Sequence, residues 1–281
     1  MAFIDCAIAS QVLDTKVNVK LYFPTDLPAA VGNTVNGVLT LLHGHAGCGA
    51  DWMEMTAASR YANDNGFVLI APSCGNSFYH DMAYGGAWKT FVTEEMPKAL
   101  GKIFHLPRER EKNYIAGLSM GGYGALYLAM SRPDLYAGCA SFSGAVDVGM
   151  MLNAAKDSDV ASSFIPVLGQ DLTLKPEDNL LCLVQKIAAL PPQQQPKILL
   201  TNGLQDIVPY QIKAQNDALH AVCRELPLAQ YLRMEWNGVH EWNFWDRSLV
   251  YAFDYFLDNK YAARKIDDWR TEMLVQSVDL F

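Results

Sequence analysis

The stretch Tyr114–Met130, YIAGLSMGGYGALYLAM, changes its hydrophobic period at a single serine. Before Ser119 the residues form a short apolar block typical of a buried strand, and after Gly122 apolar residues recur at helical spacing. Residues 117–121, GLSMG, match G-x-S-x-G, a pattern in which a strained strand-to-helix turn exposes the serine hydroxyl. The pattern predicts a nucleophile elbow here. The alternative interpretation of the same sequence pattern is a tight turn with a solvated serine.

Outward from this junction, apolar blocks alternate with helical patterns. We expect strands at residues 4–13, 17–23, 37–44, 67–73, 113–119, 136–144, 197–203 and 230–236, and helices at 51–62, 87–104, after 122, 210–225 and 243–257. Apolar strands that alternate with helices of about ten or more residues indicate a mostly parallel sheet with helices on both faces. The predicted fold class is therefore α/β.

One segment fits this alternation less well. Residues 145–195 mix Met, Asp, Ser and Pro, and two interpretations stay open: a cap over a site, or a surface elaboration. Residues 261–281 continue beyond the last expected helix as a C-terminal extension, which would pack on the domain or on a partner chain of a homo-oligomer. We expect a single domain over residues 1–281 that carries both additions.

Composition narrows the class of protein. The chain has 281 residues, of which 51% are hydrophobic, and a formal net charge of −8 without a Lys/Arg cluster, which argues against a nucleic-acid surface. Because no run of eighteen apolar residues occurs, we expect no membrane span. The N-terminus lacks the basic start of a secretory signal, and the six scattered cysteines are typical of reduced thiols, so the expected location is cytoplasmic.

A nucleophilic serine needs a base, and the base needs an orienting acid. In the α/β-hydrolase arrangement the chain order is serine, acid, histidine. Two histidines follow Ser119: His220 lies inside an amphipathic helical pattern, and His240 directly follows the last expected strand. Ligands and catalytic groups collect where strands end at the carboxyl edge of a sheet, so His240 is the predicted base. Its alternative is a loop histidine that caps the next helix.

Two aspartates compete for the role of the acid. Asp147 follows the strand after the elbow helix and has the alternative role of a helix cap. Asp206 follows the next strand in a compact G-x-x-D turn, and one helix and one strand separate it from His240. Position favours Asp206.

The loop after the third strand, LLHGHAGCG, predicts the other half of an oxyanion hole. We expect the backbone N–H groups of His45 and Met120 to be the two donors. A metal site formed by His43, His45 and Cys48 is the alternative, but no further partner at a recognisable spacing accompanies these residues. The prediction is therefore a site without metal or cofactor.

With these motifs assembled, the chain resembles the esterase D family of α/β hydrolases, which includes the mycolyltransferases, and most of all its tributyrin-esterase-like branch of small bacterial carboxylesterases. The resemblance rests on SQVLDTKVNVKLYFP, LLHGHAGCGADW, AGLSMGGYGALYLA, SFSGA, GLQD and HEWNFW. It implies Ser119 as nucleophile, Asp206 as acid, His240 as base, and the amides of His45 and Met120 as oxyanion donors. Relatives usually carry an apolar residue at the position of His45.

The resemblance implies hydrolysis of short acyl esters, from acetyl to butyryl, on small molecules such as acetylated sugars or phenolic esters. An S-formylglutathione hydrolase and an acyltransferase on the same scaffold are the alternatives. Among the aromatic residues expected near the site, we predict Trp52, Tyr79 and Trp242 as lining of the substrate pocket.

Overall fold

A central sheet organises the computed structural model, which describes residues 1–25, 35–154, 163–207 and 209–258. Within these residues, eight strands pair in the order β1-β2-β4-β3-β5-β6-β7-β8. The strands are β1 Ala2–Ser10, β2 Thr15–Phe23, β3 Gly37–Leu42, β4 Phe67–Pro72, β5 Asn113–Leu118, β6 Gly138–Phe142, β7 Lys197–Gly203 and β8 Tyr231–Trp236. From β4 to β8 all neighbours are parallel, whereas β1 and β2 pair antiparallel with each other and β2 pairs antiparallel with β4.

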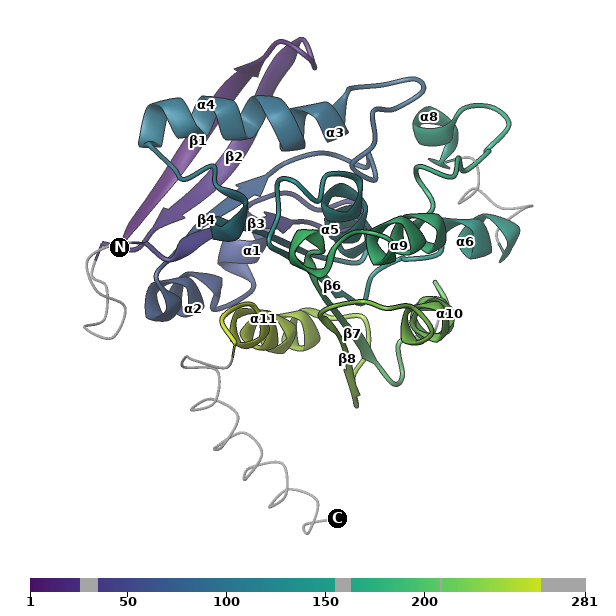
Figure 1. The fold of residues 1–281 in the computed structure, drawn as a ribbon. Helices are drawn as coiled ribbons and strands as arrows, with labels where there is room; N and C mark the ends of the chain where they lie inside the picture. Colours follow the sequence, from purple (N-terminus) through teal and green to yellow (C-terminus); the bar gives the residue numbers. More distant parts are fainter. Residues whose placement is uncertain (26–34, 155–162, 208, 259–281) are drawn as a thin grey trace, which may run out of the picture.

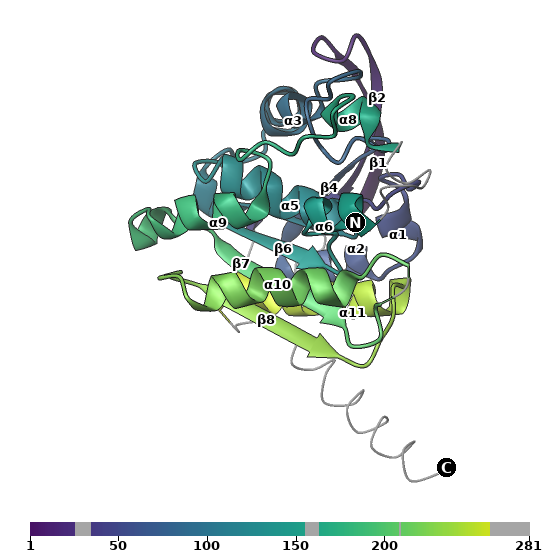
Figure 2. The ribbon, with the colours of Figure 1, turned by 90° about the vertical axis from the view of Figure 1, so that its right-hand side faces the viewer.

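Helices cover both faces of the sheet (Figure 1, Figure 2). One face carries α1 Asp51–Glu54, α2 Ala58–Asn65 and α11 Trp242–Phe256. The other carries α3 Trp88–Thr90 with the π-helical turn Phe91–Glu95, α4 Met96–Phe104, α5 Met120–Ser131, α6 Val148–Ala154, α8 Ile165–Leu168, α9 Leu180–Ala188 and α10 Ile212–Arg224. Every residue of β3 and β4 is buried, because apolar side chains on both faces of these strands meet a helical layer.

The predicted mostly parallel α/β sheet is confirmed, and each expected strand is present. The single helix expected at residues 51–62 is wrong, because the chain forms two helices there, α1 and α2. Side chains take over the backbone groups at the break: Asp246 accepts the N–H of Ala57 at 2.8 Å, and the hydroxyl of Thr56 accepts the N–H of Ala58 at 3.1 Å. A local pattern cannot reveal the first of these contacts, since Asp246 lies far along the chain.

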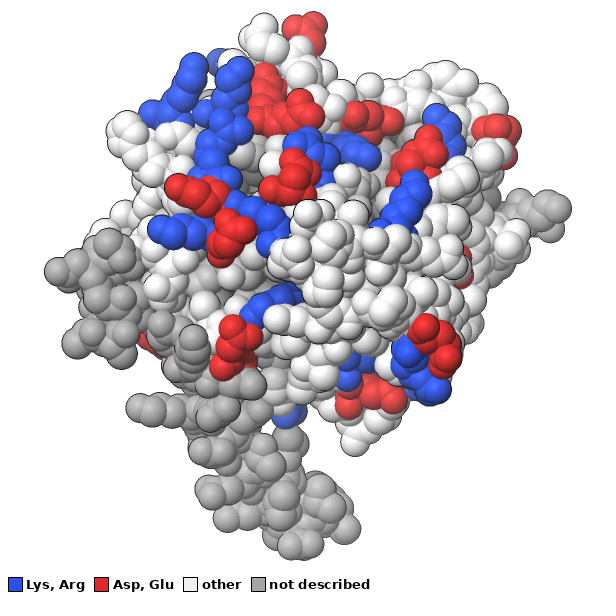
Figure 3. Space-filling view, in the orientation of Figure 1, with Lys and Arg blue, Asp and Glu red and all other residues white. Residues whose placement is uncertain are grey.

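The segment 145–195 contributes α6, α8 and α9, and α9 packs against α5. The C-terminal extension at 261–281 lies outside the described residues. Basic and acidic side chains are interspersed over the face seen in Figure 3. Among the ion pairs of the described residues, Arg132 pairs with Glu94 and Asp134. None of the helices in the described ranges is long and apolar enough to cross a membrane.

A buried polar cluster fastens the segment before α9 to α5. The hydroxyl of Tyr123 donates to the backbone oxygen of Asp178 at 2.7 Å and accepts from Nε2 of His80 at 2.8 Å. Tyr127 donates to the carboxylate of Asp178 at 2.8 Å, and its ring stacks on His80 with 4.6 Å between the centroids. Burial lowers the pKa of His80 to about 4, although Asp178 opposes this shift and Lys89 adds to it.

This cluster predicts a loss of stability in mild acid. Because the pKa of His80 lies near 4 in the folded chain and near 6.5 in an unfolded chain, the unfolded state binds the extra proton between these values. The free energy of unfolding should therefore fall as pH falls from about 6.5 to 4, by an amount on the order of 3 kcal/mol from His80. Urea unfolding at several pH values measures this change.

His80→Gln is the matched control, because its amide donates to Tyr123 without titrating. The stability of the native protein should fall toward that of His80→Gln as the pH is lowered, since only the native protein loses the contribution of neutral His80. Parallel stability curves for the two proteins would contradict the role of His80.

Candidate active site

Ser119 occupies the sharp turn between β5 and α5. Its backbone has φ 53° and ψ −118°, a conformation that side-chain-bearing residues rarely adopt and that concentrates at functional sites. Hydrogen bonds hold it there: its N–H donates to the oxygen of Phe142 at 2.9 Å, and its own oxygen accepts from Gly122, Tyr123 and Ala145. The predicted strand-turn-helix context of the serine is present.

The two glycines of G-x-S-x-G let the turn pack closely. A Cβ on Gly121 would lie 2.2 Å from the backbone oxygen of Leu42 at the end of β3, and one on Gly117 would lie 2.2 Å from the oxygen of Gly121. Backbone therefore fills the space that any side chain would need. The glycine spacing in the sequence is explained by these two contacts.

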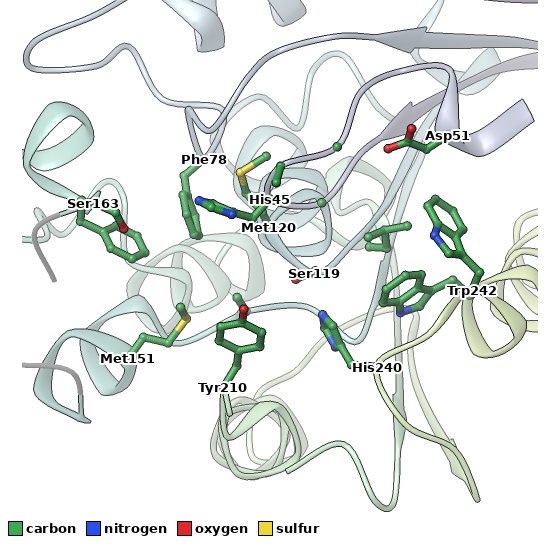
Figure 4. Close-up of a pocket in the computed structure, with 17 residues that line it drawn as sticks. His45, Asp51, Phe78, Ser119, Met120, Met151, Ser163, Tyr210, His240 and Trp242 are labelled. Carbon is green, nitrogen blue, oxygen red and sulfur yellow. The ribbon is translucent and has the colours of Figure 1, made fainter. Parts of the chain in front are cut away.

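His240 and Asp206 meet at the carboxyl edge of the sheet. Asp206 follows β7 and His240 follows β8, and because these strands are parallel neighbours, their following loops are adjacent. Nδ1 of His240 donates to Oδ2 of Asp206 over 3.0 Å. Asp206 is 3% exposed and His240 is half-buried, so the carboxylate side of the bond is shielded from water. In Figure 4 the ring of His240 points toward Ser119.

Asp147 and His220, the alternatives for the acid and the base, make other contacts. Oδ1 of Asp147 accepts the N–H of Met150 at 2.8 Å, so this carboxylate caps the start of α6. His220 lies on α10, where its Nδ1 contacts the hydroxyl of Tyr231 at 2.7 Å. Neither side chain lines the pocket that contains Ser119.

A cavity of about 480 Å³ opens in front of Ser119 and His240 (Figure 4). One end is mostly apolar: Phe78, Phe164 and Met151 line it together with Ser163, and the two phenylalanine rings pack with centroids 4.5 Å apart. At the other end, Asp51 and Trp242 form part of the lining. An apolar chain of a substrate can therefore lie at one end of the cavity, and a polar group at the other.

The structure places the three predicted pocket residues differently with respect to the cavity. Trp242 lines the cavity, but Trp52 and Tyr79 do not, because both are fully buried in the core. Trp52 packs edge-on against Trp242 with centroids 5.6 Å apart, behind the pocket wall. The hydroxyl of Tyr79 points inward and donates to the backbone oxygen of His43 at 2.7 Å.

Two further elements bring the residues predicted as oxyanion donors to the cavity. Met120 is the first residue of α5, where a helix leaves its N–H groups without an acceptor inside the helix. His45 lies in the turn from Gly44 to Gly47, which is closed by a 3.1 Å bond from the N–H of Gly47 to the oxygen of Gly44. Both His45 and Met120 line the cavity.

His43 is a structural residue of this loop. Its Nδ1 donates to the oxygen of Gly44 at 2.7 Å, and its Nε2 accepts the N–H of Cys74 at 2.9 Å. Burial lowers the pKa of His43, which favours the neutral ring that these two bonds require. Within the described part of the chain, no three His, Cys, Asp or Glu side chains are placed to hold a metal ion.

The comparison with protein families decides the identity. A family model described as "Putative esterase" matches residues 10–256, which is most of the chain. The chain belongs to this esterase family. The resemblance inferred from the motifs is thereby confirmed.

Named relatives agree with this membership. An acetyl esterase of Caldicellulosiruptor saccharolyticus is 28% identical over 272 residues, with 91% of this chain and 98% of the relative covered. An S-formylglutathione hydrolase of Arabidopsis thaliana is 26% identical over 63% of this chain and 66% of its own. In structure, the fluorophosphonate-binding serine hydrolase F of Staphylococcus aureus matches with a TM-score of 0.77 and 25% identity, covering 91% of this chain and 98% of its own. The predicted α/β-hydrolase fold is confirmed.

Several residues that line this esterase's cavity were not predicted from the sequence. Met151 and Phe164 come from the irregular segment 145–195, and Tyr210 follows Asp206 in the same loop. No local pattern marks these three. Trp245 lies one helical turn after Trp242 on α11, and its ring packs edge-on against His240 with centroids 5.0 Å apart. The three-residue spacing from Trp242 places Trp245 on the same helix face, so it could have been predicted as a neighbour of Trp242.

Proposed function

We propose that this esterase is a serine carboxylesterase that cleaves short-chain acyl esters through an acyl-enzyme, with Ser119 as nucleophile, His240 as base and Asp206 as acid. One observation carries the proposal: the Asp206–His240 hydrogen bond faces the cavity beside a serine held in a strained turn. The family membership and the acetyl esterase relative support the same reaction class. The substrate partner is a small-molecule ester.

In the first half of the reaction, Oγ of Ser119 attacks the acyl carbonyl carbon while Nε2 of His240 takes the hydroxyl proton. Asp206 holds Nδ1–H in place and stabilises the imidazolium that forms. The negative charge moves to the carbonyl oxygen, which the N–H groups of His45 and Met120 receive. Collapse of this intermediate breaks the bond to the alcohol oxygen, which leaves with the proton from His240.

In the second half, water takes the place of the alcohol. His240 removes a proton from the water as its oxygen attacks the acyl carbon, and the second intermediate expels Oγ of Ser119, which regains the proton. The products are a carboxylic acid and the free enzyme.

We also propose that residues 145–195 act as a cap within a single-domain enzyme. Met151 and Phe164 from this segment line the cavity, while the cluster around Asp178 fastens its later part to α5. The cap then closes the apolar end, where the acyl group would lie.

Asp51 distinguishes the proposed activity from hydrolysis of S-formylglutathione. It is the only Asp, Glu, Lys or Arg among the described lining residues, so the cavity offers a carboxylate and no described cation. A glutathionyl group carries more carboxylate than ammonium charge and is repelled by such a lining. A panel of p-nitrophenyl acetate, acetylated xylan, methyl ferulate and S-formylglutathione tests this. Neutral acetyl esters should give the highest kcat/KM, and a preference for S-formylglutathione would overturn the assignment.

Acyl length provides a further prediction. A methylene contributes about 0.8 kcal/mol only where it leaves water, and Phe78 and Phe164 close the apolar end. The value of kcat/KM should therefore be highest from acetyl to butyryl esters and fall beyond about six carbons, where added methylenes find no buried space. A series of p-nitrophenyl esters measures the profile.

Phe164→Ala is the variant that tests the wall. It should raise the ratio of octanoyl to butyryl hydrolysis by about tenfold, because the truncated side chain makes room for one or two more buried methylenes. Trp242→Ala, at the other end, should leave this ratio unchanged. If efficiency already rises from butyryl to decanoyl esters in the native enzyme, the apolar end is an open channel and the prediction fails.

A further inference from the structure

The turn that carries His45 is held in an unfavourable backbone conformation. Ala46 has φ 61°, and it is the third residue of the turn that the bond from Gly47 to Gly44 closes. A turn with positive φ at this position favours glycine, because a Cβ crowds the backbone there. An alanine stays in this conformation only if its surroundings hold it.

A segment from another part of the chain supplies that hold. Oδ1 of Asn76 accepts the N–H of Ala46 at 2.7 Å. The same segment anchors the start of the loop, because the N–H of Cys74 binds His43 Nε2 and the hydroxyl of Tyr79 binds the oxygen of His43. Figure 4 shows His45 and Phe78, which belong to the two segments, next to each other at the cavity.

The bracing segment is itself strained. Phe78 and Tyr79 have φ 48° and 60°, so two consecutive residues with side chains adopt the left-handed region. Strain of this kind persists where the surrounding structure fixes it, and it concentrates where geometry matters for function. Asn76, which precedes this strained backbone, and Tyr79, which lies within it, contact the loop that bears His45.

We propose that Asn76 is a positioning residue that locks the Gly44–Gly47 turn, so that the N–H of His45 stays aimed at the developing oxyanion. The proposal rests on the proposed function, in which this N–H is an oxyanion donor. Without the bond from Ala46 to Asn76, the turn can relax to negative φ at Ala46 by rotating the peptide between His45 and Ala46. The backbone of His45 shifts with this rotation, and its own N–H is thereby displaced from the oxyanion. Small displacements of preorganised donors act on the transition state more than on bound substrate.

Asn76→Ala is the primary test. We expect kcat for p-nitrophenyl acetate to fall by about tenfold with KM within twofold, because the lost geometry matters in the transition state. Affinity for a trifluoromethyl ketone inhibitor, which forms an oxyanion on Ser119, should fall by the same factor. Asn243→Ala is the matched control, since Asn243 is also exposed and lies next to the cavity residue Trp242; it should leave kcat unchanged.

Ala46→Gly separates positioning from a merely structural role. Glycine adopts positive φ without the Cβ cost, so the turn should no longer depend on Asn76. Asn76→Ala should then lower kcat by less than threefold in the Ala46→Gly background, against about tenfold in the native background. Equal losses in both backgrounds, or a loss seen only in KM, would overturn the proposal. If activity also survived Ser119→Ala, the proposed function itself would fail, which is a distinguishable result.

Discussion

Ser119→Ala should lower kcat for ester hydrolysis by about six orders of magnitude while the protein stays folded. The loss follows from the removal of Oγ of Ser119, which forms the acyl bond in the proposed mechanism and which His240 activates. Catalysis by the oxyanion donors and by substrate binding remains, and amounts to roughly 10³ to 10⁴ over water. The backbone bonds that hold the elbow involve the N–H and C=O of residue 119, which alanine also has.

A fluorophosphonate probe provides the independent measurement. It should label Ser119 in the native enzyme, as identified by mass spectrometry of the modified peptide, and should not label Ser119→Ala. Far-ultraviolet circular dichroism and the melting temperature verify that the variant is folded. Turnover near the native value in a folded Ser119→Ala protein would refute the proposed mechanism outright.

Asp206→Asn should lower kcat by about four orders of magnitude, with KM little changed. The carboxylate accepts the bond from Nδ1 of His240, which leaves Nε2 free to take the proton from Ser119. An asparagine can donate to Nδ1 instead, which places the imidazole in the wrong tautomer and removes the charge that stabilises the imidazolium. Steady-state kinetics on p-nitrophenyl acetate measure the loss.

Asp147→Asn is the matched control, because Asp147 also follows a parallel strand of the sheet but caps α6. An asparagine caps a helix as well as an aspartate does, so kcat should stay within about twofold. The reverse result, a large loss for Asp147→Asn and a small one for Asp206→Asn, would move the acid to the loop after β6.

The sequence predicted those features that depend on a local pattern or on chain order. The switch of hydrophobic period at Ser119 located the elbow, and the apolar blocks located the strands. Because loops after parallel neighbouring strands meet at one edge, their order was enough to bring Asp206 and His240 together. The family resemblance pointed to the same residues.

What could not be predicted depends on which way a side chain faces and on distant partners. Phe78 and Tyr79 are adjacent, but the first lines the cavity and the second turns into the core. Composition gives no preference between them, since both are large aromatic residues. Likewise, the role proposed for Asn76 depends on its contact with Ala46, which lies thirty positions earlier and which no local pattern reveals.

The order of the strands has a consequence for how activity arises during synthesis. Ser119 follows β5, in the middle of the sheet, and is synthesised before the acid and the base. Asp206 and His240 follow β7 and β8, which lie at the far edge of the sheet. A nascent chain that has folded only as far as β6 carries the serine without the base that activates it. Esterase activity therefore requires that β8 has paired with β7. Until then, the hydroxyl of Ser119 is not activated.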